Sequence, residues 1–389
     1  MSGKEPIEQL SSIQSEIVML SQTANVLHWD METQLASGGV AQRAEQLAYI
    51  SGLIHTKATH PRVGELIGLA EQQAGTLDAV QRQVLRVARR DYDQAVRLPQ
   101  AHVEAVSRET GLANHVWAKA RAENRFEDFR PHLEKLVELN RQAAEYLGYS
   151  DHPYDALLDG FEQGMTVAQL DQVFGEMRQG LVKLVASIAA VPQVRNDFLT
   201  RGYPADKQRE FGEKVARDIG YDFSRGFLGI SAHPFTIELS SDDVRITTRY
   251  DEHFLPTALF GIIHEAGHAL YEQGFPSGIK NTVLASGTSL GVHESQSRFW
   301  ENTVGRSRVF WQRYYKDLCQ AFPAQLADVD LETFYRGINT VAPTLIRVEA
   351  DEVTYGLHVI VRYEIENKLI AGTLAVKDLP EAWNARMQE

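Results

Sequence analysis

The sequence predicts a mainly α-helical protein with one small β-hairpin. Helical periodicity of apolar residues dominates the chain from Pro6 to about Val191. Strict alternation of apolar and polar residues is confined to one short segment, 234–250. No repeat of fixed period, low-complexity tract or long linker divides the 389 residues. A chain of this length can bury a large core, and we expect one domain over residues 1–389.

The first half should form a series of amphipathic helices joined by short connections. Helix breaks are expected where glycine, proline and polar residues gather, near residues 36–39, 60–64, 98–100, 148–164 and 190–193. Thr166 followed by Gln169 has the pattern of a capping box, in which each residue satisfies a free backbone N–H of the helix start. We therefore expect the next helix to begin there.

Segment 234–250 is predicted to form the hairpin. Apolar residues alternate with polar ones on both sides of a turn-forming stretch, with Phe235, Ile237 and Leu239 before it and Val244 and Ile246 after it. The hairpin directly precedes the strongest chemical motif of the chain. One hypothesis is an edge strand that pairs with an extended peptide; the alternative is a hairpin that only covers the core.

That motif is His264-Glu265-Ala266-Gly267-His268, inside an expected helix over 254–274. Histidines four residues apart project from one helix face. Both imidazoles can then reach one tetrahedral zinc ion, with Glu265 beside the open coordination position as a general base. The small Ala266 and Gly267 should leave access between the ligands. The alternative is a pair of histidines satisfied within a helical core or exposed at its edge.

A hydrolytic zinc site normally needs a third protein ligand. Glu272 lies eight residues after His264, about 12 Å along a helix axis, and is too distant to close the same site. Glu294 and Glu301 lie in a second expected helix over 291–305. Spacing alone favours Glu294 only modestly over Glu301.

A polar stripe is expected on a long helix over 344–370. Its members recur at helical spacing and would share one face: Arg347, Asp351, Tyr355, His358 and Arg362. Arginine binds carboxylates in a bidentate manner, which suits capture of a peptide C-terminus. The alternative is a solvated face or an internal ladder of ion pairs such as Arg347–Asp351.

Charge, cysteine content and hydropathy limit the partners and the cellular location that the sequence is compatible with. The net charge of −13 argues against nucleic acid as the main partner, because phosphate binding needs a basic surface. Cys319 is the only cysteine, so no intramolecular disulfide can form, as suits a reducing compartment. The N-terminal segment lacks the pattern of a signal peptide, and no apolar stretch is long enough for a membrane span. We expect a cytoplasmic protein without a membrane partner.

Together these motifs resemble those of the carboxypeptidase Taq family of metallocarboxypeptidases. Five segments match the family's pattern in the same order, namely 233–235 (HPF), 243–248 (DVRITT), 264–268 (HEAGH), 293–296 (HESQ) and 346–351 (IRVEAD). The chain around Trp29-Asp30 and over 152–166 is also similar to the family. The resemblance therefore runs from near the N-terminus to the last residue.

The resemblance implies a multi-helix, zincin-like peptidase with a deep groove and a small sheet beside the HExxH helix. It implies Glu294 as the third metal ligand beside His264 and His268, with Glu265 as the catalytic base. The implied cofactor is zinc, which cobalt can replace, and the implied assembly is a homodimer.

The implied reaction is hydrolysis of the C-terminal peptide bond with broad specificity, on peptides that have a free C-terminus. Three residues are implied to bind the substrate: Arg347, which would hold its terminal carboxylate, with Arg245 and His233 in the cleft.

The sequence also departs from the family pattern. Family members are longer and carry a last motif, GxxQ, beyond the point at which this chain stops, so the chain is expected to lack the family's C-terminal part. Leu35-Ala36 replaces Met-Pro, and Gly356 replaces the proline usual after Tyr355. Three alternatives remain on these grounds: a catalytically impaired, truncated paralogue that binds metal, a helical oligopeptidase or endopeptidase, and a helical interaction protein with a chance HExxH.

Overall fold

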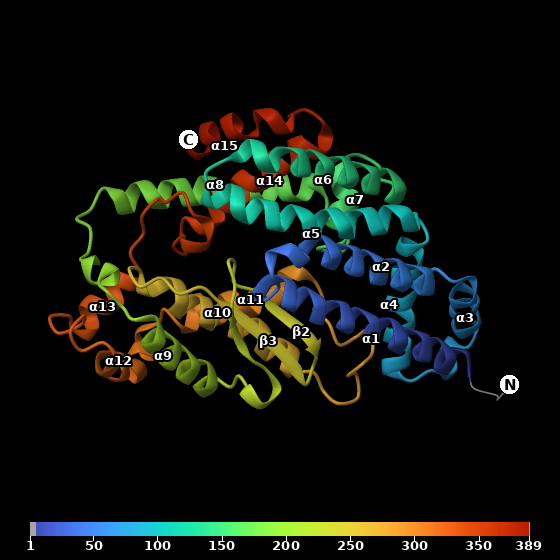
Figure 1. The fold of residues 1–389 in the computed structure, drawn as a ribbon, viewed down its shortest axis with the longest axis horizontal. Helices are drawn as coiled ribbons and strands as arrows, with labels where there is room; N and C mark the ends of the chain where they lie inside the picture. The colour runs from blue at the N-terminus through green and yellow to red at the C-terminus, as the bar shows by residue number, and fades with distance from the viewer. Residues whose placement is uncertain (1–4, 389) are drawn as a thin grey trace. The chain divides into compact units, whose positions relative to one another are not determined.

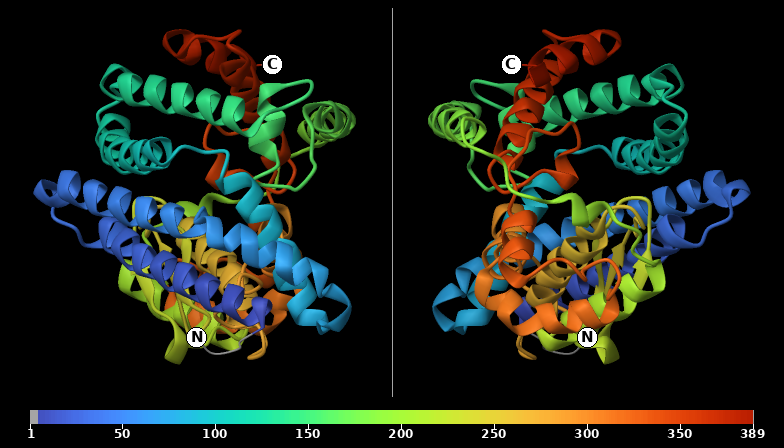
Figure 2. Two further views of the ribbon diagram at one scale, coloured as in Figure 1. Left: turned by 90° about the vertical axis from the view of Figure 1, so that its right-hand side faces the viewer. Right: turned by 90° about the vertical axis from the view of Figure 1, so that its left-hand side faces the viewer.

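The computed structural model describes residues 5–388 and confirms a mainly α-helical fold with a small sheet (Figures 1 and 2). The first four residues of the N-terminal segment and Glu389 lie outside the described range. The chain forms two compact units. The first comprises Met1–Gly160, Ile237–Val244 and Glu272–Thr288, and the second comprises Phe161–Thr236, Arg245–Tyr271 and Ser289–Glu389. The single domain expected over 1–389 stays a prediction.

The first unit is built from seven helices of the described chain. Their bounds are α1 Pro6–Thr33, α2 Val40–Ala58, α3 Pro61–Gln72, α4 Ala79–Ala95, α5 Gln100–Ala122, α6 Phe126–Leu147 and α7 Pro153–Leu158. Helix α1 packs against α2 and α3, α2 against α5, and α5 against α6, and α1 and α2 lie side by side in every view (Figures 1 and 2). A core of aliphatic residues from α1, α3 and α4 includes Leu10, Leu66, Ile67 and Leu85.

The expected helix breaks of this unit are present, except that the break expected over 148–164 contains the short helix α7, and two further breaks occur. Helix α4 begins at a capping box in which Asp78 and Gln81 bond reciprocally. Helix α5 ends before Asn124, whose positive φ of 52° cannot continue a helix. Both signals are local features of one or two residues that apolar periodicity does not detect.

The second unit contains the helices that carry the chemical motifs. Their bounds are α8 Val167–Ala189, α9 Ala205–Asp218, α10 Leu255–Gln273, α11 Leu290–Arg298, α12 Arg308–Ala321, α13 Leu331–Ile338, α14 Tyr355–Ala371 and α15 Leu379–Gln388. The capping box at Thr166 and Gln169 begins α8, as predicted. An aromatic-rich core joins α9, α10, α12 and α13 around the fully buried Trp311 and Phe334. No helix among residues 5–388 combines the length and the apolar character that crossing a membrane requires.

The predicted hairpin forms strands β2, Thr236–Ser240, and β3, Asp243–Thr248. Ile237, Leu239, Val244 and Ile246 are buried, as the alternation predicted. A third strand, β1 (Leu228–Ile230), pairs in parallel with β3, so that the strand order is β1-β3-β2. Strand β1 was not predicted because three residues are too few to show an alternating pattern.

The long helix expected over 344–370 is wrong over residues 344–354. Helix α14 begins only at Tyr355, and Arg347 lies in a three-residue 3₁₀ turn, Arg347–Glu349. The Asp351 carboxylate accepts hydrogen bonds from the backbone N–H groups of Val353 and Thr354 and from the Thr354 hydroxyl. An aspartate that caps the following turn in this way starts a helix there and does not continue an earlier one. The expected stripe is therefore broken between Asp351 and Tyr355.

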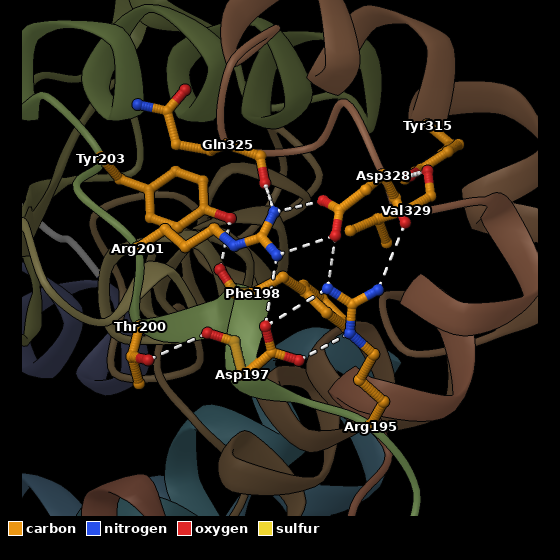
Figure 3. A network of polar contacts seen from close by, with 10 residues as sticks. All are labelled: Arg195, Asp197, Phe198, Thr200, Arg201, Tyr203, Tyr315, Gln325, Asp328 and Val329. Atoms are coloured by element: carbon orange, nitrogen blue, oxygen red, sulfur yellow. Dashed lines mark hydrogen bonds and ion pairs between the residues drawn. The ribbon is translucent and has the colours of Figure 1, made fainter.

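A charged cluster on the surface of the second unit fastens two connecting segments to each other (Figure 3). Arg195 and Arg201 each bond to both Asp197 and Asp328, with nitrogen–oxygen distances from 2.5 to 3.2 Å. Hydrogen bonds from the two guanidinium groups hold the pKa of Asp328 below its ordinary value. The cluster is balanced in charge, so it fixes the segments before α9 and before α13 without leaving an unpaired ion.

Candidate metal centre

Helix α10 presents His264, Glu265 and His268 near its middle because its opposite face is anchored in the core. Leu259, Phe260 and Ile263 belong to the aromatic-rich cluster, so the rotation of the helix about its axis is fixed. The two imidazole rings lie 5.1 Å apart, centroid to centroid. Both histidines are largely buried but not sealed, with 19% and 13% of their side chains exposed.

Helix α11 brings a carboxylate to the same two rings. The Oε2 atom of Glu294 lies 3.2 Å from Nε2 of His268 and 3.7 Å from Nε2 of His264. One potential ligand atom from each of the three residues falls within 4.8 Å of the others. Two imidazole nitrogens and one carboxylate oxygen are the donor set of hydrolytic zinc sites, so the residues present fit such an ion.

Close contact between the two helices depends on Gly267. A Cβ atom built at this position would lie 2.7 Å from Cα of Ser297 and 2.9 Å from the carbonyl oxygen of Gln296, both on α11. The sequence predicted that Gly267 would leave access between the ligands. The structure gives it another role, since the missing side chain lets the backbone of α11 approach α10 and carry Glu294 to the histidines.

The second ring nitrogen of His264 is bound by Glu301. Nδ1 of His264 lies 2.8 Å from Oε2 of Glu301, which stands on the π-helical segment Phe299–Val304 that continues α11. Burial opposes ionisation of Glu301, but the hydrogen bond to His264 and the charges of Arg298 and Arg306 outweigh it and lower the pKa of the carboxyl. Glu301, weighed from spacing as a rival ligand, thus faces the other edge of the ring from Glu294.

His268 is held differently. Its ring stacks on that of His293, with centroids 4.5 Å apart and planes inclined by 17°, and Tyr271 meets His293 edge-on. Its Nδ1 atom is buried without a hydrogen-bond partner among the described residues. Ring stacking and the contact of Nε2 with Glu294 therefore orient this second histidine, whereas the first has a carboxylate at Nδ1 as well.

Glu265 is buried beside the first strand of the hairpin, with 6% of the residue exposed. The hydroxyl of Thr236 on β2 lies 2.7 Å from Oε2 of Glu265 and donates to it. Burial raises the pKa of Glu265, while the charges of His264 and His268 and the Thr236 hydrogen bond act in the opposite direction. The sheet thus lies beside the HExxH helix, and Thr236 is a contact that the sequence analysis missed because nothing in the motif points to it.

Glu294 has the opposite electrostatic character. Burial again opposes ionisation, but the hydrogen bond with His268 and the charges of both histidines outweigh it and bring the pKa of Glu294 to about 2. The Ser297 hydroxyl lies 3.1 Å from the same carboxylate oxygen. Two glutamates that interact electrostatically with the same histidines are therefore tuned apart, one toward proton uptake and one toward permanent charge.

The residues proposed for substrate binding lie on other elements of the second unit. Arg347 donates a hydrogen bond to the hydroxyl of Tyr355, the first residue of α14, and its guanidinium lies 5.4 Å from the centre of that ring. Arg298 lies over the same ring at 3.8 Å. The Arg347–Asp351 ion pair considered as an alternative is replaced by these contacts, because Asp351 caps the turn before α14.

Arg245 lies on the hairpin and His233 directly before it. Arg245 is half-buried on β3, between the buried Val244 and Ile246, and so faces the opposite side of the strand. His233 lies in the exposed turn before β2, where its carbonyl oxygen accepts a hydrogen bond of 2.7 Å from Ser231. A role for either residue in binding substrate stays a prediction.

Comparison with known proteins agrees with the motifs. Residues 9–389 match the model of the carboxypeptidase Taq (M32) metallopeptidase family. The chain belongs to this family. It is 40% identical to Carboxypeptidase 1 of Bacillus subtilis, over 95% of this chain and 74% of the relative. It is 39% identical to Thermostable carboxypeptidase 1 of Thermus thermophilus, over 100% of this chain and 78% of the relative.

Solved structures show the same fold. The crystal structure of BsuCP superimposes with a TM-score of 0.97 at 39% identity, over 99% of this chain and 78% of that one. The M32 carboxypeptidase from Deinococcus radiodurans gives a TM-score of 0.89 at 43% identity, over 99% and 77% of the two chains. The family and its carboxypeptidase relatives make this M32 chain a metallocarboxypeptidase, a hydrolase of peptide bonds that works with a divalent metal.

Proposed function

We propose that this M32 chain is a zinc carboxypeptidase with broad preference for the C-terminal residue, in which His264, His268 and Glu294 hold the ion. The observation that carries the proposal is the approach of these three ligand atoms to within 4.8 Å, directly beside a buried glutamate. Bound there, zinc would supply Lewis-acid activation of a water molecule and of the scissile carbonyl, and cobalt would replace it.

Glu265 is the proposed general base. Its carboxylate takes a proton from the attacking water and passes it to the leaving amine. The hydroxyl of Thr236, 2.7 Å away, supports this role by orienting one carboxylate oxygen, so that the other stays directed for proton transfer. The raised pKa caused by burial suits a group that must both accept and release a proton.

Arg347 is the proposed anchor for the terminal carboxylate of a peptide, with Arg245 and His233 as further substrate-binding residues. A guanidinium matches a carboxylate in geometry and charge, and the contact with Tyr355 fixes its position. Because the anchored carboxylate ends the substrate, only the last peptide bond reaches the reacting groups. Strand β2 lies at an edge of the sheet, the position from which pairing with an extended peptide is feasible.

We also propose the setting in which the enzyme works. Residues 1–389 form one catalytic domain with a deep groove, the enzyme acts in the cytoplasm as a homodimer, and neither nucleic acid nor membrane is a partner. Support comes from the acidic composition, the single cysteine and the resemblance to the family. Light scattering coupled to gel filtration measures the assembly, and a monomer at every concentration would contradict the dimer.

The test of the catalytic proposal compares the wild-type chain with Glu265→Gln after both are loaded with zinc or cobalt. Release of free amino acid from N-blocked dipeptides is measured together with the metal content. We expect the variant to keep its metal and to lose activity by about 100- to 10,000-fold. A variant that keeps more than a tenth of the activity would contradict the role of Glu265. Metal-loaded, folded wild type without turnover would contradict the catalytic proposal as a whole.

A further inference from the structure

We propose that Glu301 is a positioning residue for the metal centre, which holds His264 in the orientation and tautomer that direct its Nε2 atom to the ion. The inference rests on the metal site proposed above. Its basis is that two carboxylates meet opposite edges of one ring. Glu294 lies 3.7 Å from Nε2, and Glu301 lies 2.8 Å from Nδ1.

The chemistry of the contact fixes the tautomer. An ionised carboxylate only accepts hydrogen bonds, so the proton of a neutral His264 ring must reside on Nδ1. The lone pair of the neutral ring then lies on Nε2, the atom that faces Glu294 and His268. A carboxylate on the far nitrogen of a ligating histidine also makes the ring a better donor to a metal ion.

Glu301 is itself held from two sides, as a positioning group must be. Arg298 donates to its Oε2 atom at 2.7 Å, and Arg306 lies 3.7 Å from its Oε1 atom. Both arginines are fixed in turn, Arg298 over the ring of Tyr355 and Arg306 over the ring of Phe260, at 3.8 and 3.9 Å. Glu301 as a residue is only 8% exposed, so its contacts are largely shielded from solvent.

The backbone around Glu301 is shaped for this position. The π-helical segment Phe299–Val304 ends at Gly305, where a Cβ atom would lie 2.8 Å from the carbonyl oxygen of Glu301 and 3.3 Å from Ile263 on α10. Segments of this kind are frequent at functional sites. The absent side chain at Gly305 therefore lets the π-helical segment lie against the helix that carries His264.

His268 provides an internal contrast. Its Nδ1 atom has no hydrogen-bond partner among the described residues, and stacking on His293 orients the ring. The two histidines thus differ at Nδ1, where a carboxylate holds His264 but only ring packing surrounds His268. Removing the charge of Glu301 should affect the first without disturbing the second.

The experiment measures zinc affinity by competition with a chromogenic chelator, in wild type, Glu301→Gln, Glu301→Ala and the control Glu364→Gln. Glu364 also bonds two arginines, Arg178 and Arg386, but no histidine within residues 5–388. We expect about 10-fold weaker zinc binding for the glutamine, which still accepts a hydrogen bond, and up to about 100-fold for the alanine. The control should stay within about twofold of wild type. Thermal unfolding of the metal-free proteins separates lost stability from lost affinity.

Equal zinc affinity of folded wild type and Glu301→Ala would overturn the inference and leave the proposed function standing. A wild-type chain that takes up no zinc would overturn the metal site and the inference with it. If neither Glu301 variant folds, a crystal structure of the zinc-loaded wild type decides. Zinc on Nε2 of His264, with Nδ1 within hydrogen-bond distance of Glu301, supports the proposal. Zinc on Nδ1, or Glu301 turned away from the ring, overturns it.

Discussion

The metal centre and the segment that carries Arg347 both belong to the second unit, but they are built in different ways. His264 and His268 stand on a 19-residue helix whose other face is anchored in the aromatic-rich core. Arg347 stands on a three-residue 3₁₀ turn in the connection between α13 and α14, and its neighbours Leu345 and Val348 are exposed by 74% and 45%. Packing positions the first group, whereas a few polar contacts position the second.

This difference separates two tasks that a carboxypeptidase must perform. Metal ligands need fixed relative geometry, which interlocked helices provide. A group that receives the end of a peptide must instead be reachable, and loops are where such groups usually lie. Substitutions at the metal centre should therefore lower metal affinity, whereas substitutions in the segment of Arg347 should impair substrate recognition.

The largest expected effect outside the catalytic base is that of Arg347→Ala. Loss of a charged hydrogen-bond donor to the substrate carboxylate should lower kcat/KM for N-blocked dipeptides by about 10- to 100-fold. Zinc affinity should remain that of wild type, and Arg347→Lys should restore little activity, since a single ammonium cannot bind in a bidentate manner. Zinc titration and steady-state kinetics on the same samples check this. An equal loss in both would remove the separation between the two regions.

Gly267→Ala should damage the metal centre instead. The added methyl group would meet the backbone of α11 at 2.7 Å, which should lower the free energy of unfolding by about 1–3 kcal/mol. Displacement of Glu294 should also weaken zinc binding by about tenfold, the loss typical when a residue that supports a metal ligand is substituted.

Gly175→Ala on α8 is the matched control, because nothing lies within 4 Å of the new methyl group. It should be neutral or stabilise the protein by up to about 1 kcal/mol, through its higher helix propensity. Chemical denaturation and zinc titration of both variants provide the measurement. Unchanged zinc affinity in Gly267→Ala would show that α11 does not depend on this close approach.

Asp351→Ala tests the cap that precedes α14. Its carboxylate accepts bonds from three backbone N–H groups, that of Ala342 included, and from one hydroxyl, and loss of such a cap costs about 1 kcal/mol of stability. We expect a small decrease in the unfolding midpoint and a higher KM for free-acid substrates, with zinc affinity unchanged. A change in zinc affinity would mean that the segment also supports the metal centre.

The difference between the packed metal centre and the segment of Arg347 also explains what could be predicted from the sequence. The HExxH helix, the helix that carries Glu294 and the hairpin follow from regular periodicity, because a buried face imposes it. The helix expected over 344–370 failed at Asp351, where local side chain–backbone bonds override a helical pattern. The contacts of Glu301, Thr236 and Tyr355 depend on tertiary packing. Only the spacing of Arg298 and Glu301, three residues apart, offered a signal for one of them.

The smallest expected effect is that of Tyr355→Phe. The ring remains for the stacking of Arg298, but the hydroxyl that accepts a hydrogen bond from Arg347 is lost. One hydrogen bond of about 1 kcal/mol corresponds to about fivefold, which should appear as a higher KM and not as weaker zinc binding. An unchanged KM would show that Arg347 is positioned without Tyr355.

The central claim is that the metal centre hydrolyses a bond whose position is set by capture of a free carboxylate. The most direct measurement compares cleavage of an N-blocked dipeptide by the zinc-loaded wild type with cleavage of the same dipeptide as its C-terminal amide. The account predicts release of the last residue from the free acid and cleavage of the amide at least about 10- to 100-fold more slowly. Equal rates for both substrates would contradict it and indicate an oligopeptidase or endopeptidase that does not recognise the chain end.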